Sequence, residues 1–525
     1  MKKLCTLLLA AAMTCAAAGA AQAIDFKVKG QWNMGFAVGE TSLVKNTRDG
    51  AGVKTKGSNE DTFAARQRVL LQLDAVASEN LSGTVMFHIG PQAWGRAGQG
   101  GALGADGVFV KVRQAYIDWL FPNTSLRTRM GIQNFALPSA AGGSAVFDVR
   151  GAAVNAHYDF NDNVGLTALW FRPYNDNYGG WTDGNGKTRE ANYLDNMDLF
   201  ALMLPLHFDG LEVTPWAMYG MRGRNVLDNG RGGANGVVNA MDGNPYVTMT
   251  PYLGTKNGNG HGLNVANYGR TSKAYGGLFW AGLPVVLKAF EPWNIEFDIN
   301  YGYVEEMGRF DVMVRNDANN IRRGSTKREG WLAKLLVEYK LDWGVPGIFA
   351  WYGSGDDGNV KNGSERMPGL APYVYTTSFM GDGNLYWSPR ADLQDINTSL
   401  AGTWGFGLQL RDMHFLDDDL SHTFRVAYWG GTNSPSMVKY MDSAYAWNST
   451  TGNFDGPYLT TNDALLEFNL VNVYQMYENF DINVELGYIA NFMDDGTWKR
   501  HSYNNFGSYE KQDIWKAHVI FTYKF

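Results

Sequence analysis

The sequence predicts an all-β fold, a transmembrane antiparallel β-barrel, and three observations support this prediction. In residues 513–525 the odd positions from Trp515 onward are aromatic or apolar, whereas Lys516 and Lys524 stand at even positions. Only a strand places alternate side chains on opposite faces. The same alternation recurs along the whole chain. No stretch offers the roughly 18 consecutive apolar residues that a membrane helix needs, so strands remain as the way to cross a membrane.

The composition suits strands that alternate between lipid and water. The chain has 17 Trp, 27 Tyr and 28 Phe, yet its mean hydropathy is only -0.28. Alternation explains both values, because half of each strand faces water and lowers the average. No linker or shift in composition divides the 525 residues into domains. One closed sheet accounts for this, because an open edge would leave backbone groups unpaired in hydrocarbon.

The first 23 residues are predicted to be a secretory signal peptide. Lys2 and Lys3 form a basic start, residues 4–18 form an apolar stretch, and small residues precede a cleavage site after Ala23. Residues 24–525 are then the single transmembrane barrel domain of an exported protein.

Both cysteines, Cys5 and Cys15, would leave with this peptide. The mature chain would then hold no disulfide, cysteine zinc site or cysteine nucleophile. A lipoprotein role for Cys15 is disfavoured, because the residues before it lack the usual leucine and small residue. The formal charge of the mature chain is the total of -7 less the +2 of the peptide lysines, which gives -9. This acidity argues against a nucleic-acid partner.

Eighteen stretches carry the strand period, joined alternately by short turns and long polar loops. In the first, Phe26 and Val28 alternate with Lys27 and Lys29. The clearest is 293–303, where a register shift of one residue would move two carboxylates into lipid. Sixteen strands are the alternative. Residues 271–287 have poorly defined edges, and residues 347–353 form a short stretch. The predicted strands are 26–38, 63–76, 81–89, 108–119, 126–133, 154–160, 164–170, 197–207, 211–220, 271–287, 293–303, 331–341, 347–353, 403–411, 423–429, 464–476, 481–492 and 513–525.

The even number of strands sets the arrangement of the connections. It places both chain ends on one side, with short periplasmic turns and long extracellular loops, as in bacterial barrels. A barrel of 16 to 18 strands encloses a water-filled channel, whereas eight strands would enclose only packed side chains. The polar parity of the strands is therefore predicted to line a pore.

The inward parity is basic in the early strands and acidic in the later ones. Facing each other across a lumen, the two sets would form a transverse field that orients dipolar solutes. We expect Arg68, Arg113 and Arg129 nearest mid-height, at the narrowest part of the wall. The alternative is that all are hydrated lumen charges without a role in selectivity; lipid-facing positions are disfavoured, because a cation at the bilayer midplane costs about 2–4 kcal/mol. The basic set is Lys27, Lys29, Arg66, Arg68, Lys111, Arg113, Arg127 and Arg129, with Asp74 as a counter-charge, and the opposite wall is Glu296, Asp298, Glu467 and Glu485.

Residues 113–117 (RQAYI) and 126–133 (LRTRMGIQ) resemble bacterial general porins. With residues 135–138 (FALP), they make the chain similar to the trimeric porins of Desulfovibrio-type sulfate-reducing bacteria. The resemblance in strand order covers the whole mature chain, and the local motif covers about residues 111–148. It implies a homotrimer of passive diffusion channels for small hydrophilic solutes and ions. The expected location is the outer membrane of a Gram-negative bacterium, in contact with lipid and lipopolysaccharide.

The resemblance also assigns two special segments. The loop after the fifth strand, about residues 134–150, is expected to fold inward as a constriction loop, with Asp148 as its charged contribution. Porins of enteric bacteria usually carry several acidic residues there, so this loop argues against strong cation selectivity and leaves room for a mild anion preference. The aromatic terminus Phe525 is expected to close the barrel and to be the signal read by the barrel assembly machinery.

Three alternatives remain open. A barrel hydrolase is disfavoured because none of the histidines, including His88, belongs to a recognised catalytic motif, and we expect no enzymatic activity and no cofactor. A surface adhesin would use the long loops at 221–270 and 355–398. Calcium could bind residues 356–359 (DDGN) or 382–384 (DGN). Neither stretch supplies the full spaced set of oxygen ligands, and ordinary turns explain both.

Overall fold

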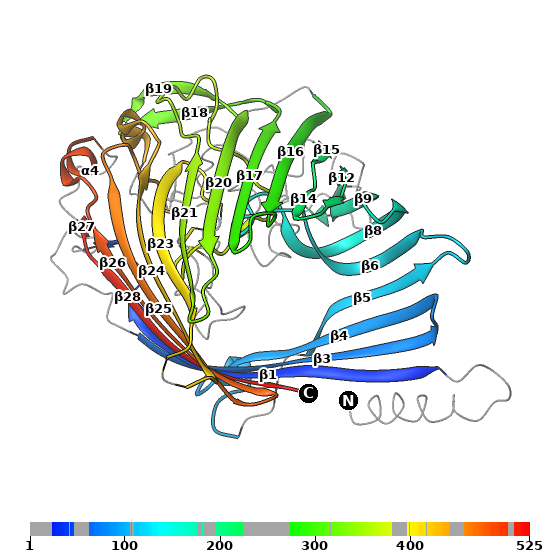
Figure 1. The fold of residues 1–525 in the computed structure, drawn as a ribbon. Coiled ribbons are helices and arrows are strands. Elements are labelled where there is room, and N and C mark those ends of the chain that lie inside the picture. Colours follow the sequence, from blue (N-terminus) through cyan, green and yellow to red (C-terminus); the bar gives the residue numbers. More distant parts are fainter. Residues whose placement is uncertain are drawn as a thin grey trace.

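In the described part of the chain, one large antiparallel sheet closes into a barrel, and four two-stranded sheets lie in the connections (Figure 1). The computed structural model describes residues 24–40, 42–46, 62–104, 107, 110–175, 181–182, 188–189, 196–223, 273–315, 317–380, 396–397, 399–415, 417–441, 456–501 and 509–525. The predicted signal peptide and its cleavage site lie outside these residues.

Eighteen ribbons cross the barrel in the described residues. Twenty strands belong to the sheet, but β12 and β13 are two parts of one ribbon, as are β14 and β15. Both ribbons are interrupted next to a proline, Pro205 and Pro215, which cannot donate to a ladder. The predicted barrel of 18 strands is confirmed, and the alternative of 16 is wrong. The strands are β1 (Asp25–Glu40), β3 (Thr62–Ser78), β4 (Leu81–Ala93), β5 (Val110–Leu120), β6 (Arg127–Ala136), β8 (Asp148–Asn161), β9 (Val164–Asn175), β12 (Asn196–Met203), β13 (Leu206–Phe208), β14 (Leu211–Val213), β15 (Trp216–Gly223), β16 (Tyr275–Leu287), β17 (Trp293–Val304), β20 (Arg328–Tyr339), β21 (Val345–Gly353), β23 (Thr403–Met413), β24 (Leu420–Gly431), β25 (Ala464–Tyr477), β26 (Phe480–Asn491) and β28 (Ile514–Lys524).

The sheet closes at β1, which pairs antiparallel with β3 on one side and with β28 on the other. Phe525 extends this seam. Its backbone N–H donates to the Gly30 oxygen (3.1 Å), and its oxygen accepts from the Gly30 N–H (2.7 Å). Closure satisfies the backbone groups that an open edge would expose to hydrocarbon. The role of Phe525 as an assembly signal stays a prediction.

Short turns lie at one end of the barrel and long connections at the other. Turns of two to six residues join β3 to β4, β5 to β6, and the later short pairs, and β1 begins and β28 ends at this short-turn end. Figure 1 shows β18 and β19 at the opposite, long-loop end. The long connections contain β2 (Val44–Asn46), η2 (Ala97–Gln99), β7 (Gly143–Ser144), β10 (Trp181–Thr182), β11 (Thr188–Arg189), β18 (Arg309–Val314), β19 (Asp317–Ser325), β22 (Tyr373–Val374), η5 (Pro435–Tyr440), α4 (Asp495–His501) and β27 (Tyr509–Lys511).

The outer face of the barrel is apolar and exposed, as β17 illustrates. Trp293, Phe297 and Ile299 point outward and are 45%, 37% and 39% exposed, whereas the inward Asp298 and Asn300 are buried. The predicted register of residues 293–303 is therefore confirmed. In the described residues no helix is both long enough and apolar enough to span a membrane.

The inner face is not polar all the way round. On β9, β12, β15 and β16 most inward side chains are apolar and buried, with Arg222 as a charged exception. The expectation that the inward parity lines water is wrong for this part of the wall. These side chains pack against residues of the long connections, and Phe147 meets Phe171 edge to face at 4.6 Å. The inward set is Leu169, Phe171, Met197, Leu199, Ala201, Met203, Trp216, Met218, Leu278 and Trp280.

The indole groups of two tryptophans link this apolar part of the wall to the connections by hydrogen bonds. Trp216 Nε1 donates to the Pro138 oxygen (3.0 Å), and Trp280 Nε1 donates to the Pro368 oxygen (2.8 Å). A buried indole needs such a partner for its N–H. Two separate connections, one containing Pro138 and the other Pro368, are therefore attached to the same side of the lumen.

The closing seam can be tested with Gly30→Ala. A Cβ at Gly30 would lie 2.4 Å from the Phe525 ring and 2.8 Å from the Leu70 oxygen. Because that oxygen belongs to the ladder, we expect a loss of about 1–3 kcal/mol of stability. The measurement is the temperature at which the unheated gel mobility of the folded barrel is lost. In the control Gly83→Ala, the new Cβ would meet nothing closer than 4.0 Å, and equal midpoints for the two variants would contradict the assignment of the seam.

Candidate functional site

Two long connections fold into the barrel and meet there. The first is residues 137–147, which is narrower than the predicted 134–150 because β6 ends at Ala136 and β8 begins at Asp148. The second lies between β21 and β23, and its described residues are 354–380, 396–397 and 399–402. β7 of the first connection pairs with β22 of the second. We call residues 364–374 of the second connection the strap.

The strap is bonded to the first connection and to the wall. The N–H groups of Leu370 and Ala371 both donate to the Val146 oxygen, at 2.8 and 3.1 Å. At the wall, Arg328 Nε donates to the Arg366 oxygen (3.0 Å). The strap thus holds the first connection from the long-loop side.

Lys334 on β20 holds the first connection from a part of the wall other than β6 and β8, the strands that this connection joins. Its Nζ donates to the backbone oxygens of Ala140 (2.8 Å) and Gly143, and lies 3.1 Å from Asp298 Oδ2 on β17. The side chains of Lys334 and Asp298 are both buried. An ammonium group has three donors and no acceptor, so these three oxygens satisfy it completely.

Carboxylates of β17 bind N–H groups of the same connection. Glu296 Oε2 accepts from the Ala141 N–H (2.7 Å), and Asp298 Oδ2 lies at 3.5 Å from the Ala140 nitrogen. We call Glu296, Asp298 and Lys334 the first clamp. It provides both donors and acceptors for a stretch of backbone that has left the sheet and would otherwise be unsatisfied.

A second clamp holds residues 378–379 of the other connection. Lys516 on β28 donates to the Ser378 oxygen, lies 2.8 Å from Glu485 Oε1 and sits over the Phe379 ring at 4.7 Å. Glu467 Oε1 accepts from the Phe379 N–H (3.2 Å). The side chains of Glu467, Glu485 and Lys516 are buried. We call these three residues the second clamp.

The clamps change the interpretation of the predicted acidic wall. Glu296, Asp298, Glu467 and Glu485 do lie on the later strands. Asp298, Glu467 and Glu485 are 0% exposed, however, and each takes part in holding a connection. These three are therefore not the water-facing charges that the sequence pattern suggested.

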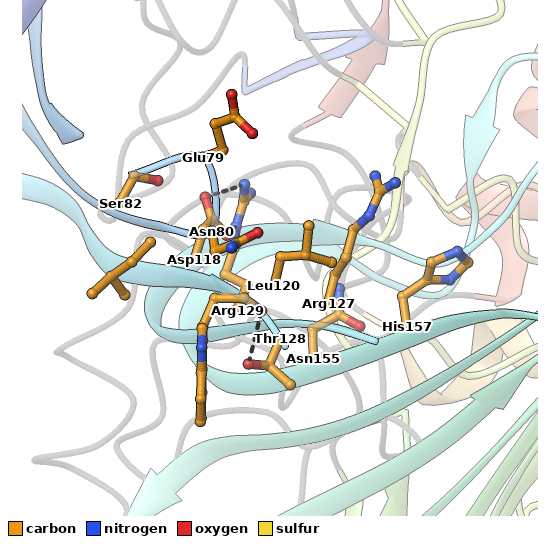
Figure 2. A pocket seen from close by; sticks show the side chains of 12 residues that line it. Glu79, Asn80, Ser82, Asp118, Leu120, Arg127, Thr128, Arg129, Asn155 and His157 are labelled. Carbon is orange, nitrogen blue, oxygen red and sulfur yellow. Dashed lines mark hydrogen bonds and ion pairs between the residues drawn. The ribbon is translucent and has the colours of Figure 1, made fainter. Parts of the chain in front are cut away.

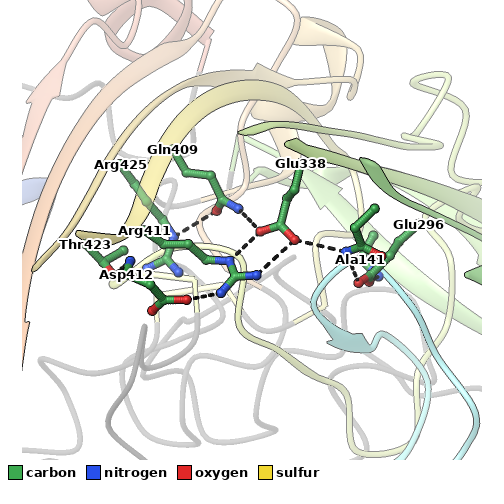
Figure 3. Close-up of polar contacts among 9 residues, drawn as sticks. Ala141, Glu296, Glu338, Gln409, Arg411, Asp412, Thr423 and Arg425 are labelled. Atoms are coloured by element: carbon green, nitrogen blue, oxygen red, sulfur yellow. Dashed lines mark hydrogen bonds and ion pairs between the residues drawn. The ribbon is translucent and has the colours of Figure 1, made fainter. Parts of the chain in front are cut away.

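A chain of side-chain hydrogen bonds continues along the wall from β17 to β24 (Figure 3). Asn294 Nδ2 donates to Glu338 Oε2 (2.9 Å). Glu338 also accepts from Gln409 Nε2 (2.8 Å) and from Arg411 Nη2 (3.1 Å). Gln409 Oε1 in turn accepts from Arg425 Nε (3.2 Å). Because Glu338 has several charge-assisted partners, its carboxylate is fixed in place.

Gly347 makes this chain of bonds possible. It lies on β21, where it pairs with Glu338 on one side and with Gln409 on the other. A Cβ at Gly347 would come within 3.0 Å of the Glu338 side chain and 3.3 Å of the Gln409 side chain. The absent side chain leaves the space through which these two residues meet across β21. No feature of the strand pattern singled out this glycine.

A basic wall lies on the inner face of β3, β4 and β5, toward the long-loop end. Arg113 Nη1 is 3.3 Å from His88 Nδ1, and Arg68 Nε is 3.4 Å from Asn33 Oδ1. His88 directly faces Lys111 across the β4–β5 pair. Lys111 is exposed, whereas Arg68 is buried. The wall consists of Arg66, Arg68, His88, Lys111 and Arg113, and it brings together four of the predicted basic residues.

The other predicted cations lie at the short-turn end. Arg127 is the first residue of β6, and Arg129 follows two residues later. The expected mid-height position of Arg129 is therefore wrong. Lys29, near the start of β1, lies 3.4 Å from Asp74, its predicted counter-charge. Lys27 lies next to it on the same face of β1.

Asp148 is placed at the end of the first connection. It is the first residue of β8, where it faces Ala136. Its backbone N–H donates to the Ala371 oxygen (2.9 Å). Asp148 therefore marks the point where this connection returns to the wall, beside the strap.

The first stretch considered for calcium is used internally. Asp356 accepts from Ser364 Oγ (2.7 Å), from the Glu365 N–H (3.1 Å) and from Tyr458 Oη (2.6 Å). Asp357 Oδ1 accepts from the Asn359 N–H (2.7 Å), which is ordinary turn chemistry. The second stretch, 382–384, lies outside the described residues. Where the chain is described, no group of three or more acidic, histidine or cysteine side chains is arranged to hold a metal ion.

Comparisons with known proteins give a likeness in structure only. No protein-family model matches the chain, and no curated protein matches it. Similar solved structures include OpdL of Pseudomonas aeruginosa, with 10% identity and a TM-score of 0.46, covering 95% of this chain and 99% of that chain. OpdQ of the same organism has 11% identity and a TM-score of 0.46, covering 95% and 98%. At these TM-scores the likeness carries no argument about function, and the resemblance to porins of Desulfovibrio-type bacteria stays a prediction.

The first clamp can be tested with Lys334→Met. The variant leaves Asp298 buried without its cation, which costs about 3–5 kcal/mol, and it removes two bonds to the first connection. We expect a larger and noisier single-channel conductance, because residues 137–147 are no longer fixed across the lumen. Lys340→Met, which changes an exposed lysine of a short turn, is the control. An unchanged current trace from folded Lys334→Met would contradict the role given to the clamp.

The strap should respond to pH through Glu365. Burial, together with the nearby carboxylates of Asp356 and Asp357, raises the pKa of Glu365 from 4.5 to about 7, although the Asp357 N–H bond acts in the opposite direction. The folded chain therefore favours the neutral carboxyl. Its stabilising contribution is greatest below pH 4.5 and is lost as the pH rises to about 7. Lys327 and Tyr458 are the other titratable groups that interact with Glu365.

We expect Glu365→Gln to remove this dependence, because glutamine stays neutral. At pH 8 its strap should be severalfold better protected from hydrogen exchange than that of the wild type, and at pH 5 the two should be equal. Comparing the two proteins at the same pH cancels the intrinsic exchange rate. Glu478→Gln, in a short turn, is the control. Equal protection of wild type and Glu365→Gln at both pH values would be evidence against this switch.

Proposed function

We propose that the protein is a porin of the outer membrane of a Gram-negative bacterium, a channel for passive diffusion of small hydrophilic solutes and ions. The observation that carries this proposal is a contrast within the inner wall. Both clamp lysines are buried, whereas the side chains of Lys29, Arg129 and Arg411 are 62%, 40% and 35% exposed. Side chains on the inner face of a closed barrel reach water only where water enters the barrel, and these three lie toward its short-turn end.

The open path runs beside the basic wall. Lys111 is exposed and Arg66 and Arg113 are half-buried, whereas the opposite side of the lumen is occupied by the clamped connections. A path with basic side chains on one border favours anions mildly through its field. The first connection narrows the path and thus acts as the constriction loop.

The assembly and its partners are part of the same proposal. We infer a homotrimer in contact with lipid and lipopolysaccharide, inserted by the barrel assembly machinery with Phe525 as its signal. The sequence resemblance supports this part. The short-turn end then faces the periplasm and the long-loop end faces the exterior.

The adhesin alternative receives less support. Of its two loops, the one at 355–398 has Met367, Leu370 and Phe379 buried within the barrel, so these residues are not available to a surface partner. Most of the other loop, 221–270, lies outside the described residues.

The proposal is tested by conductance of the purified, unheated protein in planar bilayers. We expect discrete steps, and a reversal potential in a salt gradient that indicates mild anion preference. Reversing two charges of the basic wall with Lys111→Glu and Arg113→Glu should shift that potential toward cations. Lys340→Glu, outside the lumen wall strands, serves as the control. A silent bilayer from folded wild-type protein would overturn the proposal.

A further inference from the structure

A separate pocket opens at the short-turn end of the barrel (Figure 2). It lies between the β3–β4 turn, the end of β5, the start of β6, and β8, and its volume is about 390 Å³. Glu79, Asn80, Ser82, Arg127 and His157 are among the side chains that line it. The pocket takes no part in either clamp, and it lies away from the basic wall of β3 to β5.

One cation in the pocket is rigidly held. Arg129 makes a fork to Asp118, with Nε to Oδ1 at 2.6 Å and Nη2 to Oδ2 at 2.9 Å. Its guanidinium also lies over the Tyr116 ring at 4.2 Å. Both oxygens of Asp118 are thus engaged by Arg129. This carboxylate therefore neutralises the guanidinium of Arg129. A second guanidinium beside it would need another anion.

Arg127 is that second guanidinium. It stands two residues from Arg129 on the same face of β6, and it directly faces His157 on β8. His157 is itself held by Thr167 Oγ1 and Asp159 Oδ1, both at 2.8 Å. Arg127 is exposed and, among the described residues, its side chain makes no hydrogen bond or ion pair. The five N–H donors of this guanidinium therefore lie at a polar pocket without a bonded acceptor.

We propose that this pocket is a subsite for the oxyanion group of a small solute, a carboxylate or a phosphate, held by Arg127 as the solute passes the short-turn end. The proposal rests on the proposed channel function and deepens it. A guanidinium binds such groups through two parallel hydrogen bonds, and the side chains of Asn80 and Ser82 offer further donors at the pocket edge. Glu79 on the same edge disfavours a second negative charge, so the subsite prefers a singly charged carboxylate to phosphate.

The first test measures binding without conduction. Acetate and inorganic phosphate are each titrated into the full-length protein in detergent, and bound ligand is followed by saturation-transfer NMR. We expect acetate to bind more tightly than phosphate, and Arg127→Gln to weaken acetate binding about tenfold, as for loss of a charge-assisted bond. Arg127→Lys should fall between the two, because lysine keeps the charge and loses the fork. Unheated gel mobility confirms that each variant is folded.

Lys340→Gln is the matched control, since it removes an exposed cation at the same end of the barrel but outside the pocket. Equal acetate binding by wild type and Arg127→Gln would overturn the subsite. So would an equal loss in Lys340→Gln, which would indicate general electrostatic attraction, or tighter binding of phosphate, which would contradict the part given to Glu79.

A second measurement separates this inference from the proposed function. In planar bilayers, acetate added on the short-turn side should interrupt the chloride current, with interruptions about tenfold shorter in Arg127→Gln. A wild-type protein that binds acetate but conducts no current would reject the channel and keep the binding site. A conducting wild type with the same interruptions in Arg127→Gln would reject the subsite and keep the channel.

Discussion

Backbone N–H and C=O groups that water does not reach must hydrogen-bond to other groups of the protein. The structure depends on this constraint in two places. In the wall, hydrocarbon leaves each strand no alternative to its neighbours, and the pairing of β1 with β28 removes the last edge. In the lumen, residues 137–147 and 378–379 have left the sheet, and their backbone groups need other partners. The two clamps provide them from inward side chains of the wall.

Lysine suits this task because its three donors can serve acceptors of different kinds. Lys334 divides them between two backbone oxygens and Asp298, and Lys516 binds a backbone oxygen, Glu485 and the Phe379 ring. A buried ion pair adds little net stability over an apolar replacement, because both charges lose their hydration. An apolar pair could not bind loop N–H and C=O groups, however. The benefit of the charged pairs is thus a defined position for each connection.

The eighteen strands were predictable because the period of two is local. A stretch such as β17 alternates sharply enough to fix its own register, and each predicted stretch corresponds to one ribbon. The inner face was less predictable, since the sequence pattern cannot distinguish an inward residue that faces water from one covered by a folded connection. From Leu199 to Met203 of β12 the residues of both faces are apolar, which indicated a strand but not a dry interior.

The candidate site was predicted only in part, for a related reason. Arg66, Arg68, Lys111 and Arg113 were found from parity alone, since their strands, β3 and β5, both pair with β4. The clamps join residues far apart in the chain, with Lys334 and Ala140 separated by 194 positions and Lys516 and Ser378 by 138. No local pattern encodes such a contact. The sequence pattern did not indicate Gly347, because this residue contributes only the space that it leaves between Glu338 and Gln409.

The clamps and the basic wall lie on different strands, and this separation has a consequence for selectivity. The clamp residues belong to β17, β20, β25, β26 and β28, whereas the basic wall belongs to β3, β4 and β5. The residues that hold the connections in the two clamps are therefore not the residues that carry the charges of the basic wall. In a barrel where one set of side chains did both, each change of selectivity would also shift the constriction.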